Sequence, residues 1–335
     1  MVRAKGRWQR SVALFGWIAA GTVSYPAVSR TDQAVPKPKP PFGIVVFDLH
    51  DPVPALLASL GVGVIRGSCR WVDLEPQRGV FNWSCSDNVI VGAQGLHMRS
   101  YMSVVCTPDW ANGGGGCAQM PTDIADWYSF VANFVARYTR YNVVLGIWNE
   151  PNLELIDTPD GSNYALLFLN ASNARNAVNA NFTIAGPETS HHAIATAYYV
   201  HTMQLIAAAG AFDKQDIVSV HWYTDGPPLG GYLDAVRRAA GTHEVWLSET
   251  GYASLNPQSQ ADYSDSMLQM FADASRPWWT HLIFYRLWDG QACCSDAIVT
   301  ADYHPKPAFD VYRGWIGRPL ARPRFPPHEA RNTSR

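Results

Sequence analysis

Eight alternations of apolar and amphipathic segments between residues 43 and 316 constrain this chain more than any other feature. The apolar, β-rich segments predict strands at 43–48, 62–66, 99–105, 143–148, 183–187, 217–222, 244–248 and 281–286. The segments between them predict helices at 52–60, 86–96, 122–139, 163–179, 193–209, 230–240, 259–275 and 307–316. Strands that are almost continuously apolar and separated by helices are typical of a parallel sheet in an α/β protein. Eight such units predict a single (β/α)₈ TIM barrel.

A doubly wound open sheet is the alternative architecture. Such sheets have five or six strands and often a glycine-rich first turn. Here the first turn reads FDLHDP at 47–52, without GxGxxG. The strand number and this turn favour the barrel.

Both ends of the chain differ from the barrel segment. Four basic residues within 1–10 precede an apolar run at 11–23, which predicts a secretory signal peptide at 1–29. The run is shorter than the roughly 20 residues of a membrane-spanning helix, although an uncleaved anchor is the alternative. We expect a proline-rich linker at 30–41, the barrel at 42–317 and a basic disordered tail at 318–335. The protein is then secreted or periplasmic, monomeric, and without stable membrane association after cleavage.

Six cysteines in an exported chain permit disulfides. Local spacing suggests the pairs Cys69 with Cys85, Cys106 with Cys117, and Cys293 with Cys294. Zinc is the competing use of cysteine, but neither a CxxC pair nor an HExxH helix occurs. We therefore expect no metal and no organic cofactor.

The formal net charge of −2 conceals a segregation of charge along the chain. Residues 1–41 carry +6, residues 318–335 carry +4, and the predicted barrel between them carries −12. Because nucleic acid needs a basic binding face, the acidic barrel argues against a nucleic-acid partner.

In a TIM barrel, functional side chains lie just after the strands, at their carboxyl ends. Here these positions are polar, carboxylate-rich and aromatic, which is typical of a carbohydrate site. They are Asp48, His50, Arg66, Arg70, Thr107, Asp109, Trp110, Asn149, Glu150, Asn152, Glu188, His191, His192, His221, Tyr223, Asp225, Glu249, Tyr252, Arg286, Trp288 and Asp289.

Two glutamates stand out among these positions. Glu150 follows the fourth strand in WNEPN at 148–152, and Glu249 follows the seventh strand in WLSETGY at 246–252. A carboxylate that emerges from an apolar strand is costly unless it has partners. Glycoside hydrolysis needs two carboxyl groups of this kind, one protonated and one ionised, facing each other across one site.

These two motifs resemble those of the retaining glycoside hydrolases of clan A. The resemblance implies that Glu150 is the acid/base, that Glu249 is the nucleophile, and that Asn149 contacts the sugar 2-hydroxyl. The segment RGSCRWVDLEP at 66–76 resembles the strand-2 region, where an arginine supports the nucleophile. The remaining substrate-binding residues implied by the resemblance are Arg66, His221 and Tyr223 of VHWY at 220–223, and Trp288 as a sugar platform.

Within the clan, TPDWA at 107–111 resembles the strand-3 loop of glycoside hydrolase family 39. Xylosidases and iduronidases of that family typically carry an added β-sandwich, for which the predicted barrel leaves no room. The chain is in this respect more similar to the shorter members that cleave polysaccharides.

The sequence thus predicts a secreted retaining hydrolase that cleaves β-glycosidic bonds of oligo- or polysaccharides. Double displacement requires carboxyl groups about 5–5.5 Å apart. A transglycosylase on the same site, an inactive carbohydrate-binding barrel and a metal-dependent hydrolase are the alternatives. We expect His191 and His192 to form a surface loop, with substrate or metal contact as the alternative, and Glu75 to anchor a turn. For Glu188, a site role and a solvated loop both remain open.

Overall fold

The computed structural model describes residues 40–155, 159–224, 228–288 and 296–320, all of which belong to one compact unit, Lys39–Arg335. The predicted signal peptide lies outside the described residues, as do nearly all of the predicted linker and most of the tail. The same holds for Asp225, Asp289 and the predicted pair of Cys293 and Cys294.

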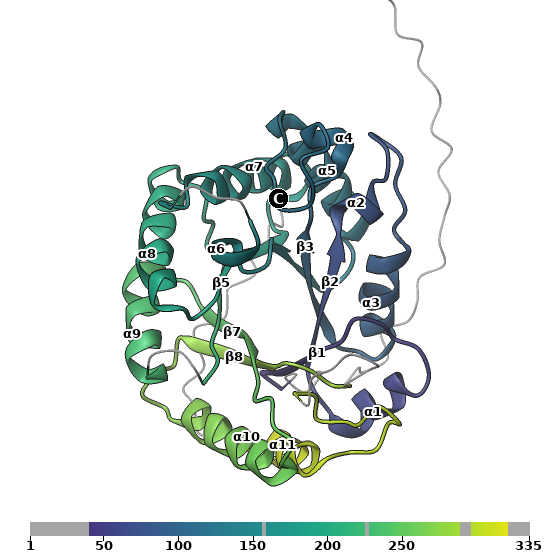
Figure 1. Cartoon of the computed structure of the whole chain (residues 1–335), viewed down its shortest axis with the longest axis vertical. Helices are drawn as coiled ribbons and strands as arrows, with labels where there is room; N and C mark the ends of the chain where they lie inside the picture. Colours follow the sequence, from purple (N-terminus) through teal and green to yellow (C-terminus); the bar gives the residue numbers. More distant parts are fainter. Residues whose placement is uncertain (1–39, 156–158, 225–227, 289–295, 321–335) are drawn as a thin grey trace, which may run out of the picture. The chain divides into compact units, whose positions relative to one another are not determined.

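Eight parallel strands form a closed barrel in sequence order, with helices around it (Figure 1). The strands are β1 (Phe42–Val45), β2 (Val64–Arg70), β3 (Arg99–Val105), β4 (Val143–Ile147), β5 (Thr183–Thr189), β6 (Ile217–His221), β7 (Val245–Thr250) and β8 (Trp279–Phe284). Each strand pairs with the next, and β1 pairs with β8 through Phe42 opposite Leu282 to close the barrel. The predicted (β/α)₈ fold is confirmed.

The eight predicted helices are present within a few residues of the expected bounds. They are α1 (Val53–Leu60), α3 (Ser84–Gly95), α5 (Ile124–Tyr138), α7 (Ser162–Asn179), α8 (Ala193–Ala208), α9 (Leu229–Ala240), α10 (Pro257–Ala272) and α11 (Pro307–Ile316). Three unpredicted helices follow β2, β3 and β4: α2 (Trp71–Leu74), α4 (Asp109–Asn112) and α6 (Pro151–Glu154). Four residues make about one helical turn, too short to leave a periodic pattern in the sequence.

Two strands extend further than predicted, and this changes the position of two charged residues. β2 continues to Arg70, so Arg66 lies within the strand, and β5 continues to Thr189, so Glu188 also lies within a strand. Both side chains are almost fully buried. They form an ion pair with each other inside the barrel, which satisfies two charges that a strand interior could not otherwise hold.

The barrel interior changes character along its axis. The part nearer the amino ends of the strands is filled by apolar side chains, namely Val45, Val64, Tyr101, Val144, Ala185, Ile217, Trp246 and Ile283. Two residues further along four of these strands stand small residues: Ser103, Gly146, Ser219 and Ser248. Small side chains leave volume for long polar groups, so the interior directly above this layer can hold a charged site.

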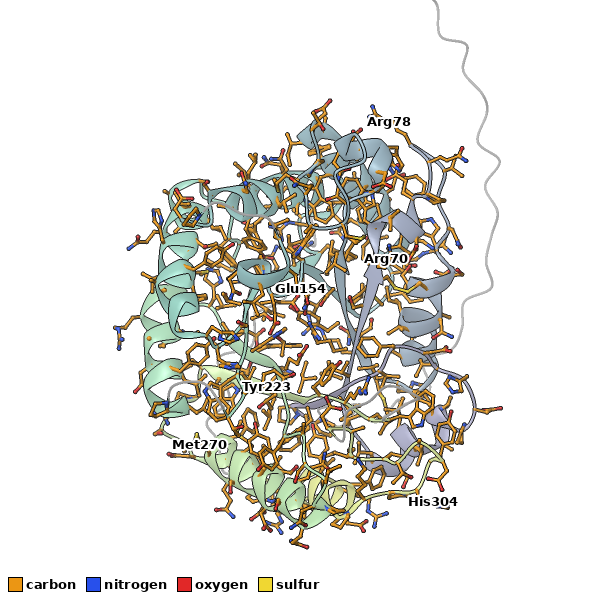
Figure 2. The ribbon with its side chains drawn as sticks, in the orientation of Figure 1. Arg70, Arg78, Glu154, Tyr223, Met270 and His304 are labelled. Atoms are coloured by element: carbon orange, nitrogen blue, oxygen red, sulfur yellow. A yellow bond between two sulfur atoms is a disulfide. The ribbon has the colours of Figure 1, made fainter. Side chains whose placement is uncertain are left out.

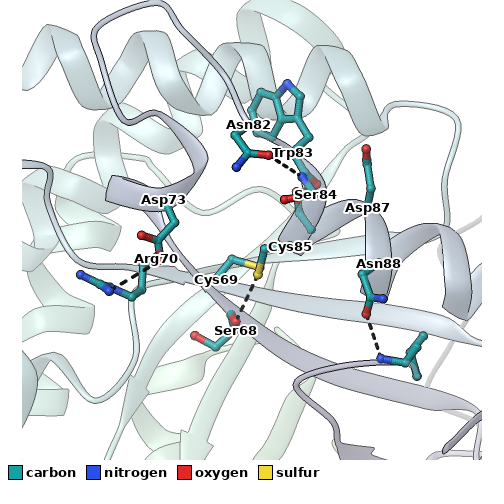
Figure 3. Close-up of a disulfide and its surroundings, with 12 residues drawn as sticks. Ser68, Cys69, Arg70, Asp73, Asn82, Trp83, Ser84, Cys85, Asp87 and Asn88 are labelled. Carbon is teal, nitrogen blue, oxygen red and sulfur yellow. Dashed lines mark hydrogen bonds and ion pairs between the residues drawn. A yellow bond between two sulfur atoms is a disulfide. The ribbon is translucent and has the colours of Figure 1, made fainter. Parts of the chain in front are cut away.

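Two of the three predicted disulfides are present and confirmed, Cys69–Cys85 and Cys106–Cys117. Figure 3 shows the first of them, which joins the end of β2 to the first turn of α3. The second joins the residue after β3 to the loop beyond α4. Among the helices that the structure describes, none has the length and apolar character needed to cross a membrane.

Candidate active site

Glu249 lies near the carboxyl end of β7 and is almost fully buried. Its Oε2 accepts a hydrogen bond from Arg66 Nη1 at 2.7 Å, and its Oε1 accepts one from the Tyr223 hydroxyl at 2.5 Å. Burial and the charge of Glu249 raise the pKa of Tyr223, so its hydroxyl stays protonated and remains a donor. Both carboxylate oxygens are therefore held in fixed directions.

Arg66 connects the two sides of the barrel mouth. Its Nη1 binds Glu249, while its Nη2 donates to Asn149 Oδ1 at 2.7 Å and to Glu188 Oε2 at 2.6 Å. Burial alone would lower the pKa of this guanidinium, but the charges of Glu188 and Glu249 outweigh burial and raise it. Arg66 is thus a permanent cation shared by three side chains from β4, β5 and β7.

Glu150 follows β4 and begins the short helix α6. Its backbone is in the left-handed region at φ 38° and ψ 56°, a strained position for a residue with a side chain. The backbone N–H of Glu150 donates to the carbonyl of Glu188 at 3.1 Å. This bond ties the turn to β5, and the carboxyl group, 17% exposed, is part of the cavity wall.

His221 ends β6 and is fully buried between carboxylates. Its Nδ1 lies 3.0 Å from Glu150 Oε1 and 3.8 Å from Glu249 Oε2, and its Nε2 lies 3.5 Å from Glu188 Oε2. Burial lowers the pKa of the imidazole, but the charge of Glu249 and the bonds to Glu150 and Glu188 raise it to about 9. His221 is therefore an imidazolium at neutral pH.

The charge of His221 acts in turn on Glu150. Burial raises the pKa of Glu150, but the hydrogen bond and the charge of His221 outweigh burial, so this pKa lies below its usual value. His221 therefore favours the ionised form of Glu150.

One ligand-type atom from each of Glu150, His221 and Glu249 lies within 4.8 Å of the other two. Within the residues that the structure describes, this is the one cluster whose spacing could suit a metal ion. The guanidinium of Arg66 binds Glu249 directly, and its positive charge would repel a cation there. The cluster is better described as an ion-paired set of acids and bases than as a metal centre.

A cavity of about 500 Å³ opens beside these carboxylates. Glu150, Glu249, Tyr223, Tyr252 and Tyr285 contribute to its wall, together with His191 and His192. Figure 2 shows Tyr223 and Glu154 inside the ring of helices. A space lined by tyrosine rings and carboxylates suits a ligand with hydroxyl groups and apolar faces.

The predicted site residues meet at this mouth with one exception. Arg66, Asn149, Glu150, His221, Tyr223 and Glu249 form one connected network. Trp288 does not line the cavity; its ring stacks on Tyr303 with centroids 5.0 Å apart, and its Nε1 donates to the carbonyl of Ala301. Tyr285, three residues earlier, faces the cavity instead.

Three secondary expectations are settled by the structure. The expectation of a surface loop is wrong for His191, which is buried and whose Nδ1 accepts a hydrogen bond from the backbone N–H of Tyr223. His192 is exposed as expected, but both side chains line the cavity, as the alternative of a substrate contact requires. Glu75 does anchor a turn, since its carboxylate accepts hydrogen bonds from Gly79 N and Trp71 Nε1.

Sequence reasoning left two carboxylates of the site unassigned. Glu188 is fully buried at its centre, and a signal existed, because it too lies at the carboxyl end of an apolar strand. Glu154 accepts a hydrogen bond from Asn149 Nδ2 at 3.1 Å. Burial, together with repulsion from Glu150 and Glu249, raises the pKa of Glu154. Its place on a one-turn helix left no pattern to find.

Residues 119–281 match the family model described as glycosyl hydrolase catalytic core. The matched segment is slightly under half of the chain and includes Glu150, Glu188, His221 and Glu249, but not Arg66. No curated protein matches the chain.

Similar solved structures are glycoside hydrolases. A family 39 enzyme from the gut symbiont Bacteroides cellulosilyticus WH2 has a TM-score of 0.66 at 18% identity, covering 83% of this chain and 64% of that one. The GH39 enzyme from Xanthomonas axonopodis pv. citri has a TM-score of 0.64 at 16% identity, with coverages of 81% and 65%. A psychrophilic family 10 endo-β-1,4-xylanase has a TM-score of 0.64 at 14% identity, with coverages of 81% and 95%.

At such identities the structures establish the fold alone, and this chain spans slightly less than two thirds of the two family 39 enzymes. Together with the family model, they confirm the resemblance to glycoside hydrolases that the sequence predicted.

Proposed function

We propose that this chain hydrolyses β-glycosidic bonds with retention of configuration, using Glu249 as the nucleophile and Glu150 as the acid/base. The observation that carries the proposal is the spacing of the two side chains, with one oxygen of each within 4.8 Å. Retaining enzymes hold their carboxyl groups about 5–5.5 Å apart, whereas inverting enzymes separate them by about 6.5–9.5 Å to admit a water molecule.

In the first step, Glu249 attacks the anomeric carbon while Glu150 gives a proton to the departing oxygen. Arg66 and Tyr223 aim the two oxygens of Glu249, so little reorganisation is needed before attack. Asn149 is held between Arg66 and Glu154, where its amide can contact a sugar hydroxyl.

In the second step, Glu150 removes a proton from water, which attacks the glycosyl-enzyme ester. The lowered pKa of Glu150 favours the ionised base that this step requires. The same shift opposes the first step at neutral pH. We therefore propose an enzyme whose turnover increases as the pH falls toward the pKa of Glu150.

The substrate that the mouth favours is a neutral glycan longer than one sugar. The carboxyl groups of Glu150, Glu154 and Glu249 lie close enough to act on one another, and such a carboxylate-rich mouth repels anionic sugars. Aromatic pairs lead outward from the cavity between the loops after β1 and β8: Phe47 contacts Tyr285, and three residues further along each loop His50 contacts Trp288. We propose Trp288 as a platform for an outer sugar unit.

Export is proposed on the basic and apolar N-terminal segment and on the two disulfides. Disulfides persist in oxidising compartments, which supports a secreted or periplasmic location.

The test is a panel of aryl β-glycosides and neutral polysaccharides with wild type and Glu249→Gln. We expect turnover by wild type only, with the β-anomer as the first product in a proton NMR time course. An α-anomeric first product would contradict retention. Binding of a polysaccharide without turnover by wild type would favour an inactive binding barrel, and coupled products with an added acceptor sugar would favour a transglycosylase.

A further inference from the structure

We propose that Glu188 is a positioning residue. Its buried carboxylate binds Arg66 and His221 on the side away from the cavity. Arg66 is thereby oriented toward Glu249, and His221 toward Glu150. The effect of Glu188 on catalysis depends on the proposed function. Its effect on Arg66 and His221 does not, because those contacts involve no substrate.

Glu188 is shared between the two cations through one oxygen. Its Oε2 accepts from Arg66 Nη2 at 2.6 Å and lies 3.5 Å from His221 Nε2. Each cation faces a catalytic candidate on its other side, Arg66 through Nη1 at 2.7 Å from Glu249 and His221 through Nδ1 at 3.0 Å from Glu150. A single side chain therefore separates Glu188 from each of the two proposed catalytic carboxylates.

Glu188 does not touch the cavity. It is fully buried and absent from the cavity wall, so a substrate in that cavity would not reach it. Its Oε1 accepts from the Tyr101 hydroxyl at 2.8 Å, and Ser103 Oγ donates at 2.9 Å to Oε2. These donors favour the ionised form, and with Arg66 and His221 they hold the pKa of Glu188 below its usual value despite burial.

The neighbouring strand is built to admit this carboxylate. Gly146 on β4 lies against it, and a Cβ at that position would collide with Glu188 Oε1 and with the Tyr101 ring. A glycine within a strand is unfavourable unless another group needs the space. The carboxylate of Glu188 is that group.

Glu188 helps to keep His221 protonated, in addition to the larger effects of Glu249 and Glu150, because its Oε2 lies 3.5 Å from His221 Nε2. The charged groups that face the imidazole are Glu150 after β4, Glu188 on β5, Glu249 on β7 and Arg66 on β2, and Glu154 on α6 interacts with it through its charge. From α9, the Tyr232 hydroxyl donates to the His221 carbonyl. Without Glu188, the Nε2 side of the ring would face Arg66 alone at 3.4 Å, which favours an unprotonated Nε2 that accepts from the guanidinium.

The experiment is an NMR titration of the full chain labelled with ¹³C-histidine, because it needs no substrate. The His221 ring signal is assigned as the one missing from His221→Asn. In wild type we expect its midpoint near pH 9. In Glu188→Gln, which keeps the shape and removes the charge, we expect the midpoint to fall by about one unit or more.

Two controls separate charge from other effects. Ser103→Ala removes one hydrogen bond to Glu188 but leaves its charge, so the His221 midpoint should stay unchanged. Asp216→Asn removes a carboxylate that pairs with a different buried arginine, Arg175, at 2.8 Å, and should also leave His221 unchanged.

An unchanged His221 midpoint in Glu188→Gln would overturn the proposal. If Glu188→Gln does not fold, Glu188→Asp provides the comparison. The shorter side chain keeps the negative charge but moves it one methylene further from Arg66 and His221. A wild-type midpoint below pH 7 would overturn the proposal without any variant.

The kinetic arm uses whichever substrate of the panel wild type cleaves. We expect kcat/KM of Glu188→Gln to fall about 10²-fold, with KM little changed, because misplaced catalytic groups affect the chemical step most. Asp216→Asn should retain wild-type activity. If wild type cleaves nothing on the panel, the proposed function fails while the titration still decides the role of Glu188.

Discussion

Both ends of the barrel hold a histidine near an arginine and a glutamate, yet the two histidines are opposite in charge. At the end where the strands begin, His281 lies 3.9 Å from Glu244 and stacks on Trp246, and the Arg99 guanidinium lies over the same Trp246 ring. Burial lowers the pKa of His281 to about 3; the charge of Glu244 opposes this shift without overcoming it, and the charge of Arg99 adds a smaller decrease. At the mouth, three carboxylates raise the pKa of His221 to about 9. Burial alone therefore does not set the charge of a histidine; the number and distance of its anionic neighbours do.

The largest effect is expected from substituting, in turn, the glutamates at the two ends of one strand. Glu249→Gln should lower kcat by about 10⁴-fold or more, because it removes the proposed nucleophile. Glu244→Gln, just before the same strand β7, should leave kcat within a small factor of wild type. Steady-state kinetics on the panel substrate measure both. Comparable losses would show that the mouth is not the reaction site.

The second test replaces the arginine at each end of the barrel with lysine, in separate variants. Arg66→Lys keeps a positive charge but loses the fork that reaches Glu249, Glu188 and Asn149 together, so kcat/KM should fall about 10²- to 10³-fold. Arg99→Lys at the end where the strands begin should change kcat/KM little. If Arg66→Lys retained full activity, charge alone would explain the role of Arg66 and its geometry would be irrelevant.

The third test concerns space rather than charge. Gly146→Ala should destabilise the fold by about 1–3 kcal/mol and also reduce activity, because the methyl group displaces the Glu188 carboxylate. Gly314→Ala in α11, where an added methyl meets nothing, should be neutral or stabilise by up to about 1 kcal/mol. Urea unfolding monitored by tryptophan fluorescence gives both values. Equal stability of the two variants would contradict a tightly filled mouth.

The smallest expected effect is the pH dependence of stability. The folded pKa of His221, about 9, lies above the unfolded value of about 6.5. Its contribution is complete below pH 6.5 and is lost as the pH rises through 9. The folded pKa of His281, about 3, is depressed, so its contribution is complete above pH 6.5 and is lost as the pH falls.

We therefore expect His221→Gln to flatten the alkaline side of a plot of Tm against pH, and His281→Phe to flatten the acid side, each by a few degrees. Flattening on the same side for both variants would remove the contrast between the two ends.

The sequence alone predicted the barrel because period and order are properties of long segments. Element bounds were less predictable: Pro187 made the fifth strand end too early, since proline normally interrupts strands, and this left Glu188 without a clear assignment. The burial of Glu188 depends on Arg66, a partner 122 residues away, and no local pattern records such a pair.

Glu150 and Glu249 were identifiable because each is a single charge at the end of an apolar run, within a motif that resembles known enzymes. Trp288 illustrates the limit of such reasoning. Which aromatic side chain faces the cavity depends on the residue at which β8 ends, and the strand ends at Phe284, so Tyr285 is the one that reaches the cavity.

The two disulfides join residues only 16 and 11 positions apart, one between the end of β2 and α3 and the other between the residue after β3 and the loop beyond α4. Neither crosses the barrel, whose closure depends on the pairing of β1 with β8. The segments beyond β2 and β3 are therefore structurally separable from the barrel strands. Each can be lengthened, shortened or replaced together with its disulfide, while the carboxylates keep their positions. Under the proposed function, changes in these segments would alter which glycan is bound and not the carboxylates that react with it.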